Sequence, residues 1–224
     1  MTNLRAVVFD WRGTLVAAPT YEQWVGTALR SLDRDDDRRT VADIISRIVA
    51  ADGKPSRLDA PGVDCAAARH RAAFYAVFAD AGLDADLADA LYSVEADPAN
   101  NHFALDAATT LLSLASRGVS IAVLSDIHFD IRPSFTTLGV AHTIDAFVLS
   151  FEHGVQKPDP AIFALALKSL DTSAEQTLMV GDRQIPDGGA LDVGMPTLLL
   201  PPLTNIHQRR LHHVTAIFGA SAPG

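Results

Sequence analysis

The chain has 224 residues, of which 48% are hydrophobic and 20% charged, a composition typical of a packed globular protein and not of a disordered one. Its formal net charge of −9 argues against nucleic acid or an anionic membrane as the main partner. Cys65 is the single cysteine, which excludes an intrachain disulfide and fits a reducing cytoplasm. We find no signal-peptide pattern and no apolar run near the roughly 20 residues of a membrane span, so we expect a cytoplasmic protein.

The first predicted element is a strand over residues 6–9. The run Ala-Val-Val-Phe is apolar throughout, which is typical of a strand buried on both faces. Asp10 follows at its carboxyl end, and Gly13 allows the backbone to turn tightly after it. Ligands of open parallel α/β sheets bind at the carboxyl ends of strands, so Asp10 is the first candidate site residue.

The next eighty residues show helical patterns and no convincing strand. Apolar spacing predicts four helices, over residues 21–32, 40–51, 63–81 and 84–96. Thr20 suits the N-cap of the first helix, and Gly82 suits the C-cap of the third. We therefore predict a helical domain of residues 17–97, inserted directly after the first strand.

Strands then alternate with helices. The strands are expected over residues 119–124, 146–150, 177–180 and 197–200, and the helices over 105–116, 133–138, 160–170 and 187–193. This order predicts an α/β core domain, residues 1–16 and 98–224, with a doubly wound parallel sheet. The last segment, residues 205–224, is locally basic and is expected to be a surface helix with a solvated face.

Polar side chains follow four of the predicted strands, and these are Asp10, Ser125, Lys157, and Asp182 with Asp187. Because parallel strands end at one edge of a sheet, these side chains should converge. Such a set suits phosphoryl transfer: a carboxylate can attack phosphorus, and a hydroxyl and an ammonium can hold the phosphoryl oxygens. The two further carboxylates would repel each other unless a cation joined them, and Mg²⁺ prefers oxygen ligands.

Four segments of the chain resemble the motifs of the haloacid dehalogenase-like (HAD) hydrolase superfamily. They are FDWRGTL at residues 9–15, VLSD at 123–126, QKPDPAIF at 156–163 and VGDRQIPD at 180–187, with GMPT following at 194–197. The resemblance implies a Rossmann-like core and a mobile helical cap of the type inserted after the first strand. It also implies hydrolysis of a small phosphorylated or otherwise anionic metabolite.

The resemblance also implies a role for each matching residue. Asp10 corresponds to the nucleophile, Ser125 to the phosphate-binding hydroxyl and Lys157 to the charge-neutralising lysine. Mg²⁺ would be held by Asp10, the backbone carbonyl of Arg12, Asp182 and Asp187. Arg12, Thr14 and Asp126 are expected to bind the substrate.

Arg12 departs from the family pattern. The phosphatases of the family have a second aspartate at this position, which protonates the leaving group and then activates water. A guanidinium stays protonated and cannot do this, and losing one positioned acid/base typically costs about 10²–10⁴ in rate. Asp126 and His128 are candidates to replace it, but a structural role explains both residues better, since Asp readily caps turns.

Three functions remain open at this point. The first is Mg²⁺-dependent phosphatase-type hydrolysis, weak or atypical because the acid is missing. The second is C–halogen or C–P hydrolysis, as in haloacid dehalogenases or in phosphonoacetaldehyde hydrolases, whose Schiff-base lysine would have to be Lys54, the one lysine of the cap. The third is binding of a phosphorylated ligand or partner without turnover, with Arg12 contacting the anion or salt-bridged to Asp10.

Substrate specificity is expected to depend on the cap. Candidate residues are Tyr21, Trp24 and the arginines between Arg30 and Arg71. Trp24 and Phe74 also fit core packing at their helical spacing. Closure of the cap over the core would exclude water from the site.

Overall fold

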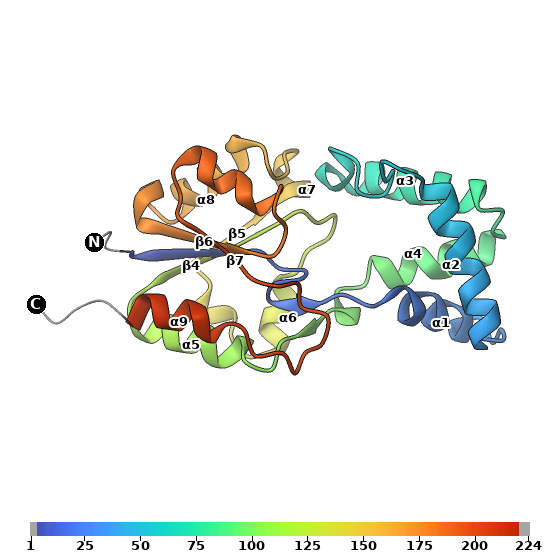
Figure 1. The fold of residues 1–224 in the computed structure, drawn as a ribbon, viewed down its shortest axis with the longest axis horizontal. Coiled ribbons are helices and arrows are strands. Elements are labelled where there is room, and N and C mark those ends of the chain that lie inside the picture. Colours follow the sequence, from blue (N-terminus) through green and yellow to red (C-terminus); the bar gives the residue numbers. More distant parts are fainter. Residues whose placement is uncertain (1–3, 220–224) are drawn as a thin grey trace, which may run out of the picture.

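The computed structural model describes residues 4–219, and a five-stranded parallel sheet lies at its centre (Figure 1). The strands are β1 (Ala6–Phe9), β4 (Ser120–Ser125), β5 (Ala146–Leu149), β6 (Thr177–Gly181) and β7 (Thr197–Leu199), in the spatial order β5-β4-β1-β6-β7. Phe9 at the end of β1 pairs with Val123 of β4 and Val180 of β6. The middle position of β1 brings its carboxyl end between those of its two neighbours.

Helices cover both faces of the sheet, as the alternation of strand side chains requires. Val7 and Phe9 belong to an apolar cluster with α5 (Ala107–Ser116) and α9 (His212–Gly219). Val8 points to the opposite face and packs in a cluster that includes α8 (Pro160–Ser169). The predicted doubly wound α/β fold is confirmed, and the all-apolar run in the first strand is explained by burial on both sides.

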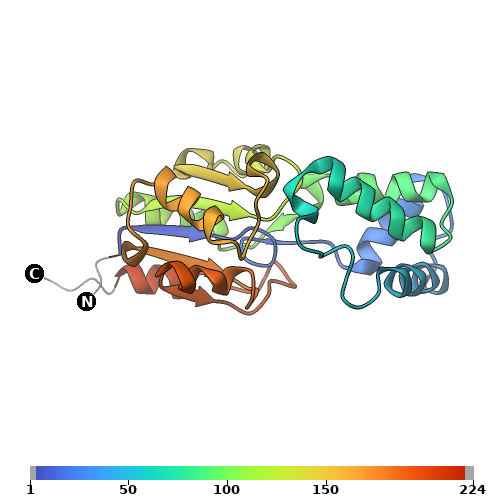
Figure 2. The ribbon, with the colours of Figure 1, turned by 90° about the horizontal axis from the view of Figure 1, so that it is seen from above.

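A second group of helices extends beyond the carboxyl edge of the sheet (Figures 1 and 2). Its helices are α1 (Tyr21–Ser31), α2 (Arg38–Asp52), α3 (Ala67–Asp80) and α4 (Ala85–Glu95), and we call residues 17–97, these helices with their connecting segments, the helical unit. Its apolar cluster is drawn entirely from residues 24–96 and includes Trp24 and Phe74. The Trp24 indole donates to the carbonyl of Leu91 at 2.8 Å, so both aromatic residues pack in the interior as their spacing suggested.

Two short strands join the helical unit to the sheet. β2 (Val16–Ala17) and β3 (His102–Phe103) pair antiparallel where the chain leaves for the helices and where it returns. These strands were not predicted, because two residues are too few to show a period-2 pattern.

Three further elements differ from the predictions. The helix expected over residues 63–81 is divided at the extended residue Ala66 into a 3₁₀ turn, η1 (Val63–Cys65), and α3. The carbonyl of Asp64 in η1 accepts a hydrogen bond from Ser150 Oγ, so a contact with the core holds this turn out of the helix. The segment Asp187–Val193 is a 3₁₀ helix, η5, and a short unpredicted helix, α7 (Ser150–His153), follows β5.

The remaining elements are short. They are α6 (Arg132–Thr137) and the 3₁₀ turns η2 (Pro98–Asn100), η3 (Ala141–Thr143) and η4 (Ala174–Gln176). No helix among residues 4–219 combines the length and the apolarity that crossing a membrane requires.

The basic C-terminal segment is more deeply packed than the sequence suggested. Val214 and Phe218 of α9 are buried, and the Arg210 guanidinium donates to the carbonyl of Thr14 at 2.7 Å and to that of Pro201. The expected helix with a solvated face is present as α9, where His212 and His213 are exposed, but Arg210 before it is buried against the loop that follows β1. Residues 220–224 of this segment lie outside the described residues.

Candidate active site

A buried lysine joins two buried carboxylates at the carboxyl edge of the sheet. Lys157 Nζ lies 2.5 Å from Asp10 Oδ1 and 2.5 Å from Asp187 Oδ1, and the lysine side chain is fully buried. Asp10 directly follows β1, and its backbone N–H continues the ladder by donating to Val180 at 2.8 Å. The structure thus brings together residues that lie 147 and 30 positions apart in the chain.

The protonation of this cluster follows from burial and charge pairing. Burial raises the pKa of Asp10 to about 7, and the Lys157 ammonium opposes that rise. Burial alone would lower the pKa of Lys157, but Asp10 and Asp187 outweigh it and raise that pKa. Burial likewise acts to raise the pKa of Asp187, yet Lys157 and backbone N–H donors bring it below its usual value. The lysine is therefore held as a cation among acids.

The acidic residues fit a divalent cation of the Mg²⁺ type. Asp10, Asp182 and Asp187 each offer a carboxylate oxygen, and these oxygens lie within 4.8 Å of one another. Burial and the neighbouring Asp187 raise the pKa of Asp182, while Lys157 and Arg183 oppose that rise. An all-oxygen donor set with net negative charge is the kind that Mg²⁺ prefers.

The backbone around these acids leaves room for them. Gly13 has a φ of +81°, and a Cβ there would lie 2.5 Å from Asp182 Oδ2, so a glycine is required on both counts. Thr14 Oγ1 lies 3.4 Å from Asp182 Oδ1. Asp187 Oδ2 accepts from the backbone N–H of Asp182 at 3.0 Å and of Arg183 at 2.8 Å, so this carboxylate also orders the loop after β6.

Ser125 lies at the same edge. It is the last residue of β4, the strand beside β1, and is 1% exposed. Its neighbour Asp126 accepts from the Lys157 backbone N–H at 2.9 Å and from Arg183 Nη2 at 3.3 Å. Asp126 therefore supports the lysine loop, while its expected substrate-binding role stays a prediction.

Arg12 points away from Asp10. Its guanidinium pairs with the Glu95 carboxylate, Nη1 to Oε1 at 2.5 Å, and its Nε donates to Asn101 Oδ1 at 2.9 Å. The alternative in which Arg12 is salt-bridged to Asp10 is therefore wrong. The Arg12 side chain instead connects the loop after β1 to the end of α4 through its ion pair with the Glu95 carboxylate.

A cavity of about 620 Å³ opens beside Lys157, between the helical unit and the core. The helical unit contributes Gly62, Cys65 and Arg69, and the core contributes Gln156, Lys157 and Arg183 among the lining residues. Arg183 also pairs with Asp59 at 3.0 Å, which links the two sides. Lys54, by contrast, is exposed on a turn and does not line this cavity.

The sequence did not indicate Asp59, Asp64, His70 or Arg183 as parts of this region. Asp59, Asp64 and His70 have no local spacing that distinguishes them, whereas Arg183 lies within the segment at 180–187 and directly follows Asp182. The packing of η1 against α7 places Asp64 at the boundary between the helical unit and the core.

Comparison with known proteins agrees with this geometry. A protein-family model described as haloacid dehalogenase-like hydrolase matches residues 4–191. Among curated relatives, ribulose-1,5-bisphosphate 5-phosphatase of Halopiger xanaduensis is 36% identical over 99 residues, which cover 43% of this chain and 41% of that protein. The match thus spans about two fifths of that relative's length.

Solved structures with the same fold cover nearly the whole chain. A HAD phosphatase from Thermococcus onnurineus superposes with a TM-score of 0.63 at 20% identity, covering 96% of this chain and 98% of that one. A 2-haloacid dehalogenase from Pseudomonas syringae gives 0.61 at 23% identity, with 96% and 99% covered. With the family model matching well over half of its length, this chain belongs to the haloacid dehalogenase-like hydrolase family.

Proposed function

We propose that the protein is a Mg²⁺-dependent hydrolase of a small phosphorylated metabolite, with Asp10 as the nucleophile. The observation that carries the proposal is the meeting of Asp10, Lys157 and two further acids at one sheet edge. A relative named as a phosphatase, 36% identical over part of the chain, supports the same reaction class.

The chain's own residues account for the steps of such a reaction. One oxygen of Asp10 is engaged by Lys157, which leaves the other to attack phosphorus and to form an aspartyl-phosphate as the P–O bond to the leaving group breaks. Lys157 and the Ser125 hydroxyl would stabilise the phosphoryl oxygens. Water then attacks phosphorus, which releases inorganic phosphate and restores the Asp10 carboxylate.

A bound Mg²⁺ would neutralise the phosphate charge and the repulsion among the acids, and Asp10, Asp182 and Asp187, together with the Arg12 carbonyl, are the residues proposed to hold it. The helical unit, residues 17–97, is proposed to act as the cap. Arg183 and Asp59 already span the boundary between the two parts.

The position of Arg12 has a consequence for the substrate. Since the guanidinium is engaged by Glu95 and Asn101 and cannot donate and retrieve a proton, the leaving group departs without the usual acid. We therefore expect faster turnover of phosphates with acidic leaving groups, such as acyl or aryl phosphates, than of alkyl phosphates.

The test is turnover of a panel of alkyl, aryl and acyl phosphates with and without Mg²⁺, for wild type and for Asp10→Asn. We expect Mg²⁺-dependent activity that Asp10→Asn abolishes and that declines as the leaving group becomes more basic. Activity that survives Asp10→Asn would refute the nucleophile assignment. If no phosphate is hydrolysed at all, the catalytic proposal fails and ligand binding without turnover takes its place.

A double variant tests the account of Arg12. Arg12→Asp combined with Glu95→Gln supplies the missing carboxyl and removes the carboxylate that would repel it. We expect alkyl phosphate turnover to rise by about 10²–10⁴ relative to Glu95→Gln alone, the matched control. An unchanged rate would show that another group already serves as the acid.

A further inference from the structure

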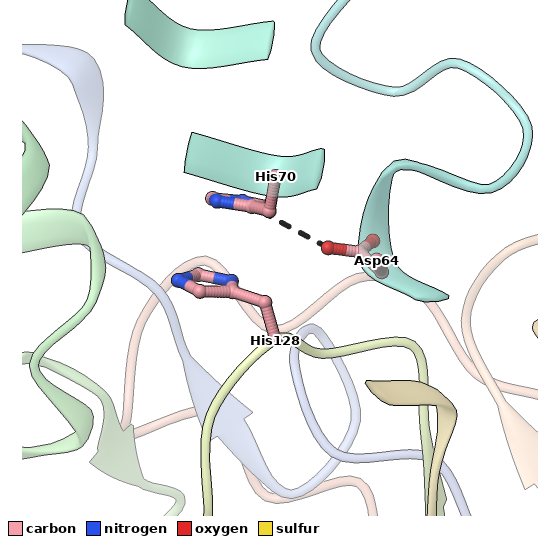
Figure 3. A group of neighbouring side chains, drawn as sticks. All are labelled: Asp64, His70 and His128. Atoms are coloured by element: carbon pink, nitrogen blue, oxygen red, sulfur yellow. Dashed lines mark ion pairs between the residues drawn. The ribbon is translucent and has the colours of Figure 1, made fainter. Parts of the chain in front are cut away.

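A second cluster of ionisable side chains lies between the helical unit and the core (Figure 3). Asp64 comes from η1 and His70 from α3, while His128 follows β4 on the core side. Each offers one ligand atom, and the three atoms lie within 4.8 Å of one another. Both histidines are buried, His70 to 3% exposure and His128 to 4%.

His128 has two polar atoms that nothing in the described chain satisfies. Neither Nδ1 nor Nε2 has a hydrogen-bond partner among residues 4–219, although both are inaccessible. Leaving buried polar atoms unpaired costs about 1–3 kcal/mol each, so such atoms usually have a partner. The ring instead stacks on His70, with centroids 3.4 Å apart (Figure 3).

His70 is held in an orientation that suits a metal ligand. Its Nδ1 lies 3.3 Å from the Tyr92 hydroxyl, while its Nε2 faces Asp64 Oδ1 at 3.8 Å, beyond hydrogen-bonding range. Two ligands bound tetrahedrally to Zn²⁺ at about 2.0–2.1 Å lie roughly 3.4 Å apart. A nitrogen and a carboxylate oxygen at 3.8 Å are thus near the spacing of two ligands of one ion, with Tyr92 as the outer partner that orients the imidazole.

The electrostatics of the cluster are compatible with a cation. Burial lowers the pKa of His70 to about 2 and that of His128 to about 3, so both rings are neutral with a free lone pair. Burial, followed by the nearby Asp126, raises the pKa of Asp64 to about 7. The positive charge of Arg12 also lowers the pKa of both rings, but this guanidinium is paired with the Glu95 carboxylate.

We propose that Asp64, His70 and His128 form a second metal site, for a transition-metal ion such as Zn²⁺, that joins the helical unit to the core. Two imidazoles and one carboxylate are a donor set that suits Zn²⁺, and they differ from the all-oxygen set around Asp10. The proposal does not depend on the reaction proposed for Asp10.

Binding requires one of the two rings to turn. The two imidazole planes are only 13° apart, and nitrogen lone pairs lie in the ring planes. One ring must therefore turn about its side-chain torsions for both nitrogens to meet one ion. The three ligands leave a fourth position for water or another group.

The test is titration of the chelator-treated full chain with Co²⁺, followed by its visible ligand-field bands and by displacement with Zn²⁺. The titration is done in an Asp10→Asn, Asp182→Asn background, which removes the carboxylate site. Asp64→Asn, His70→Ala and His128→Ala are compared with a matched control, His212→Ala with His213→Ala, which removes an exposed neighbouring pair of histidines.

We expect one equivalent of Co²⁺ to bind, excess Mg²⁺ not to displace it, and either cluster histidine variant to abolish the bands while the control retains them. Tyr92→Phe should weaken binding by about 10–100-fold. Circular dichroism identifies any variant that fails to fold, in which case the other two variants decide. Absence of the bands in the parent protein, their persistence without His70 or His128, or their loss in the control would overturn the proposal.

Discussion

The two buried clusters of ionisable groups compensate for burial in different ways. Around Asp10, Lys157 pairs with two carboxylates, so the charges stay and stabilise one another. Around His128, no carboxylate among the described residues forms a short pair with either ring, so burial keeps both imidazoles neutral, and the two nitrogens of His128 have no hydrogen-bond partner. A buried group therefore stays charged where an oppositely charged side chain lies beside it, as at Lys157, and becomes neutral where none does, as at His128.

The clusters also differ in what assembles them. Asp10, Lys157 and Asp187 come from loops at one edge of a single sheet, so the sheet determines their distances. Asp64 and His70 come from the helical unit and His128 from the core, so that cluster exists only while the two parts are in contact. The first cluster should resist conditions that disturb the second.

The largest effect is expected from Lys157→Ala. It leaves Asp10 and Asp187 buried as neighbouring like charges, and breaking a buried pair in this way costs about 3–5 kcal/mol in the free energy of unfolding. Urea unfolding measures the loss, with the exposed Lys168→Ala as the control. A loss no larger than that of the control would show that the carboxylates escape to solvent or share a proton.

The next largest effect is expected on stability at low pH, and it tests whether His70 and His128 are neutral in the folded state. Below pH 6.5 the unfolded chain binds protons on His70 and His128 that the folded chain does not. Folding stability therefore falls as pH falls towards the folded pKa values, about 2 for His70 and about 3 for His128. Each histidine contributes up to about 1.4 kcal/mol per pH unit. Asp64 has the opposite effect on folding stability. Its pKa is raised to about 7 in the folded state, so as pH falls below 7 the folded chain takes up this proton before the unfolded chain does, which stabilises the fold.

Urea unfolding at a series of pH values checks this prediction. His128→Gln should flatten the decline below pH 6.5, Asp64→Asn should steepen it, and the exposed His142→Gln should leave it unchanged. Equal slopes in all four proteins would mean that the rings are not held neutral in the folded state.

A smaller loss of stability is expected when the ion pair between Arg12 and Glu95, which joins the core to the helical unit, is removed. Glu95→Gln removes the charge from the pair, whose side chains are 26% and 17% exposed, and should cost about 1–3 kcal/mol. The control is the exposed Glu175→Gln. If thermal unfolding shows no difference between the two variants, the pair does not hold the loop after β1 against α4.

The smallest loss of stability is expected from an exposed ion pair. Arg30 and Asp36 pair at 2.6 Å on the surface of the helical unit, with side chains 59% and 39% exposed. Arg30→Ala should cost only about 0.2–1 kcal/mol, because solvent and salt screen exposed pairs. A larger loss, measured by urea unfolding, would mean that surface pairs matter as much as the buried clusters.

The sequence by itself determined the sheet and the place of its polar edge. The run at residues 6–9 is apolar on both faces, and the apolar runs of the other core strands are local properties as well. Asp10 and Asp182 directly follow such strands, and Ser125 is the last residue of one. Parallel strands end at one edge, so convergence followed from topology alone. The four helices of the helical unit were predictable for the same reason, apart from the division at Ala66.

Only the tertiary structure decided which partners the side chains have across the two parts. Arg12 pairs with Glu95, 83 positions away, and His128 stacks on His70, 58 positions away, although neither pair has a signal in local spacing. Such pairs depend on the angle at which the helical unit packs on the core. That angle is set by many small contacts summed over the boundary, whereas the elements themselves are set by nearest neighbours along the chain.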